Sequence, residues 1–154
     1  MFTEYLQDGV DQETSKRKYG PDRDRLAWKL SELTSQARGR IVEKAVVREL
    51  ERRGFTGVEH IGGTNPFDIA TDQGQVEVKS SLINSHGEGF LFQRIEPRSF
   101  DLLVLVAIHP DWIEIKAMSR GEAWNMVNGS KSISVTQKRF ATLDEMPEMN
   151  YTTA

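Results

Sequence analysis

The segment from Leu102 to Ile108 is apolar at every position and is the longest uninterrupted apolar run in the chain. A short run of this kind is typical of a strand that is covered on both faces, because a strand covered on one face alternates. The run is far shorter than the roughly 20 residues that a membrane-spanning helix needs. We therefore expect a sheet with protein layers on both sides and no membrane span.

Other extended segments accompany this strand. After Thr56, short β-prone segments are separated by turns rich in Gly, Pro and Asn. Trp112 to Met118 alternates in the way expected of a strand covered on one face. Together these segments predict a mixed sheet with strands at about 58–61, 67–71, 75–80, 90–95, 102–108 and 112–118. A further short strand is expected at 133–136.

Three helices are predicted from capping residues and apolar periodicity. Asp22 is a suitable N-cap for the first, and Gly39 interrupts its apolar stripe. Gly54 suits the left-handed position that ends the second. Ser119 and Glu122 form a capping-box pattern before the third. The predicted spans are 22–37, 39–53 and 119–127.

The length of 154 residues predicts one compact domain of the α/β (α+β) class. Within it we expect an N-terminal helical extension or arm at 1–38, a core at 39–143 and an aperiodic tail at 144–154. The chain has no Cys, which excludes a disulfide framework, a thiolate metal site and a thiol nucleophile. No secretory signal opens the sequence, so we expect the cytoplasm, or the host cytoplasm if the gene belongs to a phage.

Charge is unevenly distributed along the chain, which carries a net charge of -3. Residues 16–53 contain 12 basic and 6 acidic residues, whereas residues 1–15 contain 4 acidic residues and no basic one. A basic block of this kind can contact phosphate groups, but a solvated helical surface has the same composition.

Glu43 is the anomaly of the second predicted helix. At 100° per residue it falls about 100° from Val42, in the middle of the apolar face that includes Val46 and Leu50. A carboxylate that faces the interior is costly unless it is paired, protonated or close to a metal ion. We therefore expect a partner for Glu43.

Two predicted neighbouring strands carry further charged residues. The period of two places Glu77 and Lys79 on one strand face, and Asp68 on the preceding strand can lie beside Glu77. Two adjacent carboxylates repel each other, and a hard divalent cation such as Mg²⁺ would offset that repulsion. A hairpin with a charged solvent face is the alternative interpretation.

The succession of Glu43, Pro66-Phe67-Asp68 and Glu77-Val78-Lys79 resembles the PD-(D/E)xK nuclease superfamily, over about Gly39 to Ile115. The resemblance implies the restriction-endonuclease-like fold, with a central mixed β-sheet flanked by α-helices. Two departures are visible: Phe67 separates the proline from the aspartate, and Gln93 lacks the tyrosine that follows a similar glutamine in exonuclease-like branches.

The resemblance also implies roles for individual residues. Asp68 and Glu77 would bind Mg²⁺, for which we expect Mn²⁺ to substitute, and the Val78 carbonyl would be a third ligand. Lys79 would orient or deprotonate the attacking water. Glu43 would hold a water or support a second ion. No organic cofactor is expected.

The implied function is a site-specific endonuclease, restriction-type or homing-type, that hydrolyses duplex DNA. A homodimer or higher homo-oligomer is expected, because one small active site cuts one strand. A nuclease resembling Holliday junction resolvases is the first alternative, and a non-catalytic DNA-binding or assembly subunit is the second. Residues predicted to contact DNA, each of which is also compatible with a structural or solvating role, are Lys16, Arg17, Lys18, Arg38, Ser80, Ser81, His86, Gln93 and Arg94.

Overall fold

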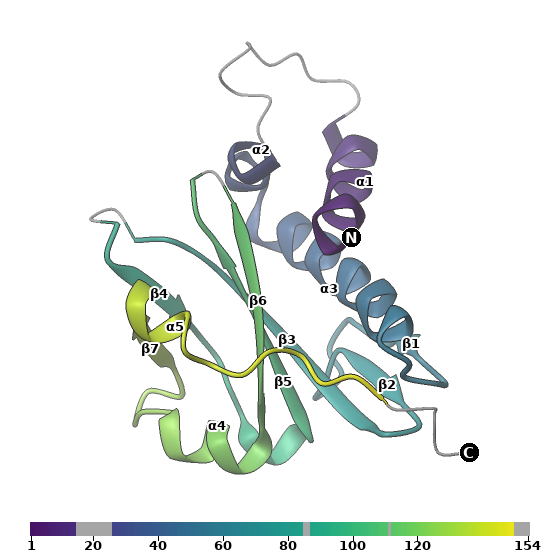
Figure 1. Cartoon of the computed structure of the whole chain (residues 1–154), viewed down its shortest axis with the longest axis vertical. Coiled ribbons are helices and arrows are strands. Elements are labelled where there is room, and N and C mark those ends of the chain that lie inside the picture. Colours follow the sequence, from purple (N-terminus) through teal and green to yellow (C-terminus); the bar gives the residue numbers. More distant parts are fainter. Residues whose placement is uncertain (15–25, 85–86, 111, 150–154) are drawn as a thin grey trace.

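A five-stranded sheet in the order β1-β2-β3-β5-β6 forms the centre of the molecule (Figure 1). The computed structural model describes residues 1–14, 26–84, 87–110 and 112–149. β3 and β5 are parallel and the other neighbouring strands are antiparallel, so the central sheet is mixed, as predicted. The strands predicted near 90–95 and 133–136 are not part of it and pair with each other in a separate two-stranded sheet. The strands are β1 (Glu59–His60), β2 (Ile69–Thr71), β3 (Gly74–Leu82), β4 (Gly89–Phe92), β5 (Leu102–Ile108), β6 (Ile113–Ser119) and β7 (Ile133–Thr136).

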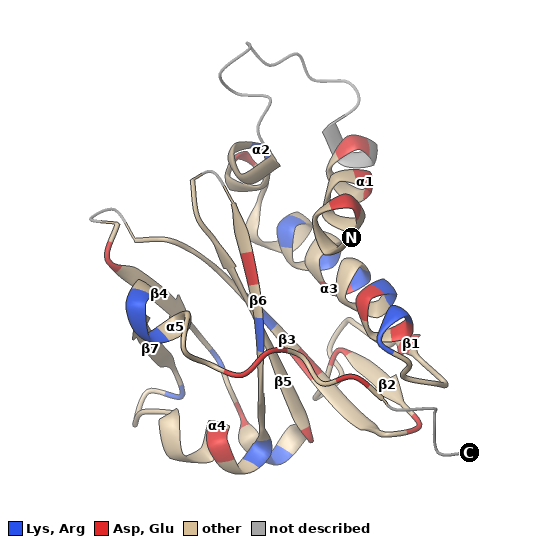
Figure 2. Cartoon of the chain, in the orientation of Figure 1, with Lys and Arg blue, Asp and Glu red and all other residues tan. Residues whose placement is uncertain are grey.

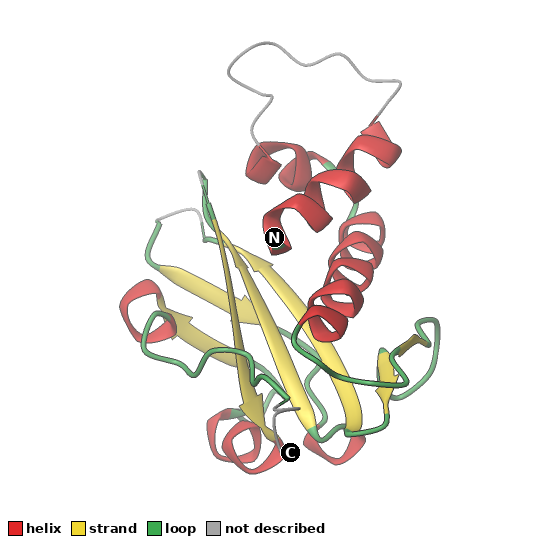
Figure 3. Cartoon of the chain, turned by 45° about the vertical axis from the view of Figure 1, so that its right-hand side comes forward, coloured by secondary structure: helices red, strands yellow, loops and turns green. Residues whose placement is uncertain are grey.

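Both faces of the central sheet are covered (Figure 3). Val104 and Val106 of β5 pack with the helices α1 (Phe2–Thr14), α2 (Leu26–Glu32) and α3 (Ser35–Arg52). Leu103 and Leu105 point the other way and pack with the β4–β7 pair and with two short helices. These are α4 (Arg120–Met126) and α5 (Gln137–Phe140). The prediction that Leu102–Ile108 is covered on both faces is confirmed. None of the helices described is long and apolar enough to cross a membrane.

The break between the first two predicted helices lies at Thr34, so its placement at Gly39 is wrong. α3 begins at Ser35 and runs through Gly39, because the Thr34 side chain accepts a hydrogen bond from the Ala37 amide (3.1 Å) and caps the helix. The cost of one glycine, about 1 kcal/mol, is small for a helix of this length. Gly54 adopts φ 97° after the helix, as predicted.

Within the N-terminal extension expected at 1–38, the sequence analysis assigns no helix before residue 22, whereas the structure has α1 there. The apolar residues of α1 are few and widely spaced. Phe2, Leu6 and Val10 recur every four residues and are buried against α3. Gly9 lies where the two helices approach each other: a Cβ at this position would be 2.7 Å from Ile41 Cγ2. The described part of the predicted arm therefore packs onto the core. Figure 2 shows acidic α1 beside basic α3, and Asp8 forms an ion pair with Arg48 (2.7 Å).

Residues 144–149, the described part of the predicted tail, have no regular secondary structure but are anchored to the core. Met146 is buried in the core, the Asp144 carbonyl accepts a hydrogen bond from Ala117 N, and the Met149 amide donates to Arg53 O. The Arg53 guanidinium also contacts the Met146 carbonyl (2.6 Å) and the buried carboxylate of Glu49 (2.8 Å). α3 and the C-terminal segment are thus joined through one arginine.

Gly9→Ala is expected to destabilise the protein by about 1–3 kcal/mol, although alanine favours helices, because the new methyl group collides with the buried, β-branched Ile41. Gly39→Ala is the matched control. Its Cβ would meet only Glu43 Oε2 at 3.7 Å, so we expect a gain of about 0.5–1 kcal/mol. Urea unfolding measures both. In an Ile41→Ala background the cost of Gly9→Ala should fall; an unchanged cost would mean that the helix contact is not its origin.

Candidate active site

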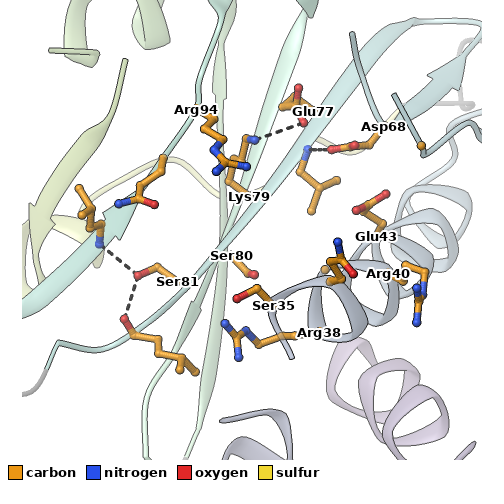
Figure 4. Close-up of a pocket in the computed structure, with 17 residues that line it drawn as sticks. Ser35, Arg38, Arg40, Glu43, Asp68, Glu77, Lys79, Ser80, Ser81 and Arg94 are labelled. Atoms are coloured by element: carbon orange, nitrogen blue, oxygen red, sulfur yellow. Dashed lines mark hydrogen bonds and ion pairs between the residues drawn. The ribbon is translucent and has the colours of Figure 1, made fainter. Parts of the chain in front are cut away.

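An open pocket of about 880 Å³ lies between the first half of α3, strand β3 and the segment after β4 (Figure 4). Most of the residues proposed from the sequence line it. Glu43 comes from α3, Asp68 from the loop before β2, and the remainder from β3 and residues 93–94. The predicted residues that line this pocket are Arg38, Glu43, Asp68, Glu77, Val78, Lys79, Ser80, Ser81, Gln93 and Arg94.

The pocket opens along β3 because β2 is short. β2 pairs with β3 only over Gly74 to Val76, and no described strand continues along this edge. Asp68 supplies the hydrogen bonds to β3 where β2 ends. Its amide donates to Val76 O (3.1 Å), and its Oδ2 accepts from Val78 N (2.8 Å). Because the N–H and C=O of one strand residue point to the same side, the Val78 carbonyl is directed to this edge as well.

Asp68 and Glu77 form a close pair of acids in the pocket. Burial, a hydrogen bond to Asp68 and the negative charge of Asp68 raise the pKa of Glu77 to about 9. Glu77 therefore holds a proton at neutral pH unless a cation offsets the charge of the pair. Lys79 Nζ lies 3.9 Å from Glu77 Oε1, which places an ammonium group beside the acids.

The oxygen atoms of this edge are suitable for a hard divalent cation. Two carboxylates and one backbone carbonyl are the ligand types that Mg²⁺ takes, with water completing its coordination. Within the described ranges, no three His, Cys, Asp or Glu side chains converge closely enough to hold a metal ion by themselves. A divalent cation at this edge would therefore need water molecules to complete its coordination.

The partner expected for Glu43 is His60, which the sequence analysis missed. His60 Nε2 lies 2.9 Å from Glu43 Oε1, and both side chains are partly buried. Burial raises the pKa of Glu43, and the hydrogen bond to His60 opposes this shift. The sequence signal for this pair is a histidine in the first strand after the helix that carries the inward-facing acid.

The same short segment also holds Asp68. The amides of Ile61 and Gly62 both donate to the Asp68 carbonyl, at 2.8 and 3.1 Å. Gly62 adopts φ 59°, and a Cβ there would lie 3.0 Å from the His60 ring. The segment 60–62 thus fixes one acid of the pocket through its side chain and another through its backbone.

The predicted DNA-contacting residues divide into three groups. Ser80, Gln93 and Arg94 line the pocket. Arg38 and Ser81 also line it but have structural bonds: Arg38 contacts the carbonyls of Leu30 (3.4 Å) and Leu33 (3.3 Å), and the Ser81 hydroxyl donates to Leu82 O and accepts from Leu91 N. Lys16, Arg17, Lys18 and His86 lie outside the described residues. Among the lining residues that the sequence analysis missed, three have polar or charged side chains: Ser35, Gln36 and Arg40.

Comparison with solved structures shows similarity to the bacterial homing endonuclease I-Ssp6803I, with a TM-score of 0.52 and 18% sequence identity. The match covers 70% of this chain and 82% of the homing endonuclease. Neither a protein-family profile nor a curated protein sequence matches the chain. At this identity the similarity concerns the fold. The chain therefore shares the fold of a homing endonuclease, and the predicted class, a mixed central sheet flanked by helices, is confirmed.

Proposed function

We propose that the protein is a Mg²⁺-dependent endonuclease of the PD-(D/E)xK type that hydrolyses phosphodiester bonds of duplex DNA at particular sites. The convergence of Asp68, Glu77 and Lys79 with Glu43 in one open pocket carries this proposal. The structural similarity to a homing endonuclease supports it. Cutting both strands at one locus requires two such sites, so the proposed active form is a homodimer or a higher homo-oligomer.

Each residue of the pocket has a distinct role in this proposal. Asp68, Glu77 and the Val78 carbonyl hold Mg²⁺, which when bound activates water and offsets charge on the phosphate oxygens. The Lys79 ammonium donates hydrogen bonds to the attacking water and orients it toward the phosphorus. Glu43, held by His60, accepts a hydrogen bond from water on the opposite side of the pocket.

Asp68→Asn is expected to lower the cleavage rate by about 100-fold or more while duplex binding is retained, because the substitution removes one metal-binding charge and keeps the shape. The measurement is cleavage of a long duplex and of a synthetic four-way junction, each with Mg²⁺ and with EDTA. Asp72→Asn, an exposed acid in the β2–β3 turn, is the matched control and should cleave like wild type.

Each outcome of this assay has a defined meaning. Discrete duplex fragments that require Mg²⁺ support the proposal, and their ends reveal the target. Symmetric nicking of the junction alone would replace it with a resolvase-like function. Equal cleavage by Asp68→Asn and wild type would show that the metal assignment is wrong.

Glu43→Gln is expected to lower the single-turnover cleavage rate by about 10-fold, because a carboxylate that positions water is replaced by an amide. His60→Ala should have a similar effect, and His60→Gln a smaller one, since its amide can still bond Glu43. The double variant should be no slower than the slower single variant. Glu114→Gln is the control: its carboxylate also bonds a histidine, His109, at 2.8 Å, but lies outside the pocket. Additive losses would argue against a joint role.

Glu77→Gln is expected to stabilise the metal-free protein increasingly as the pH rises from 5 to 9. The folded-state pKa of Glu77, about 9, exceeds its ordinary value of 4.5, so the protonated carboxyl is tolerated at acidic pH and its ionisation costs stability as the pH rises. Urea unfolding in EDTA should show a difference of about 1 kcal/mol or more at the alkaline end. The exposed Glu59→Gln variant should follow wild type. A pH-independent difference for Glu77→Gln would contradict the assignment.

A further inference from the structure

Arg94 has a backbone conformation that favours glycine. Its φ is 57°, a value that costs a residue with a Cβ about 1 kcal/mol. The neighbouring side chains explain why the backbone holds this shape: Phe92 and Ile95 are fully buried, and the Ile95 amide donates to Lys131 O (2.8 Å). The turn between these two buried residues leaves Arg94 exposed at the pocket.

The charge of the Arg94 guanidinium is not offset by an ion pair within the described part of the chain. Among the residues described, none forms a hydrogen bond or an ion pair with it. The acid nearest in sequence, Glu96, is engaged elsewhere: it contacts Lys131 at 2.9 Å and Arg98 at 4.0 Å. Lys131 offers a direct comparison, because it is the other non-glycine residue with a positive φ (59°) in the described chain, and its cation is paired.

Arg94 and Lys79 enter the pocket from different segments, and Figure 4 shows both side chains pointing into it. The acids Glu43 and Asp68 lie toward the α3 and β2 side of the pocket in the same view. Lys79 lies 3.9 Å from the Glu77 carboxyl, whereas no described acid pairs with Arg94, so the guanidinium is available to attract an anion that enters this space. A guanidinium binds phosphate oxygens with two parallel hydrogen bonds, which an ammonium cannot do.

We infer that Arg94 is a substrate-binding residue that clamps a backbone phosphate of the nucleic acid in the pocket, on the side opposite Glu43 and Asp68. This inference rests on the proposed nuclease function and specifies how that site holds its substrate. Arg94 contacts non-bridging phosphate oxygens through its guanidinium, and the strained turn fixes its direction before the substrate arrives. Backbone strain that is retained beside a candidate site is consistent with such preorganisation.

Arg94→Gly is the decisive variant, because glycine suits φ 57° and removes the guanidinium without threatening the fold. Lys131→Gly is the matched control: it relieves the same backbone conformation and removes one positive charge outside the pocket. Binding of a fluorescent synthetic duplex is measured by anisotropy at several salt concentrations. The Asp68→Asn background prevents cleavage.

We expect Arg94→Gly to weaken binding about tenfold or more and to reduce the slope of log K against log salt by about 0.9. Arg94→Lys should restore part of the affinity. Lys131→Gly should leave affinity within about twofold and the slope unchanged, since it contacts no phosphate in this proposal. Thermal unfolding should show Arg94→Gly to be at least as stable as wild type.

The results separate this inference from the function on which it rests. If Asp68→Asn binds the duplex equally well with and without the added Arg94→Gly substitution, the phosphate clamp is overturned and the nuclease proposal still stands. Equal losses in Arg94→Gly and Lys131→Gly also overturn it, because they would report general charge. A wild-type protein that neither binds nor cleaves DNA overturns both proposals.

Discussion

The hydrogen bond from the Val78 amide to the Asp68 carboxylate, 2.8 Å long, supports both the sheet and the candidate site. Strand β3 loses its neighbour after Val76, and an unpaired peptide edge inside a protein is costly. Asp68 supplies the missing acceptor and is thereby held beside Glu77 and the Val78 carbonyl. The short length of β2 therefore opens the sheet edge, positions the acid pair and directs a carbonyl into the pocket at once.

Helix α3 shows how the same problem, an inward-facing acid, has two solutions on one helix. Glu49 is almost fully buried, and although burial alone would raise its pKa, hydrogen bonds from Arg52 and Arg53 lower it below the ordinary value. Glu43 has a single histidine, His60, as its hydrogen-bond partner, and burial raises the pKa of Glu43. The Glu49 carboxylate is thus held by two arginines at the C-terminal end of α3. The Glu43 carboxylate has one partner, His60, and can accept a further hydrogen bond in the pocket. The sequence analysis identified Glu43 as an inward-facing acid but not Glu49, which is also buried on α3.

For ligand binding, the local distribution of charge around the pocket is more important than the net charge of -3. Basic residues recur along α3, as the colours of Figure 2 show, and four cations line the pocket together with three acids. Such a mixture suits a ligand that combines a metal cation with phosphate groups, since each component finds opposite charge. The pocket brings together charged residues from α3, the loop before β2, strand β3 and the turn at Arg94, which are far apart in the sequence.

Sequence alone determined the features that depend on short-range patterns. The buried strand at Leu102–Ile108, the capping box at Ser119 and the glycine end of α3 are local, because apolar periodicity and backbone conformation act over a few residues. The spacing of Glu43, Asp68, Glu77 and Lys79 also suggested one site. Tertiary structure decided which partners these residues have. His60 meets Glu43 across two elements, the Thr34 cap outweighs Gly39, and α1 packs against α3 with Gly9 at the close approach. The position of Arg94 at the pocket depends on the burial of Phe92 and Ile95 on either side of it. Contacts of this kind depend on how distant segments approach each other, and no pattern within a single segment encodes that approach.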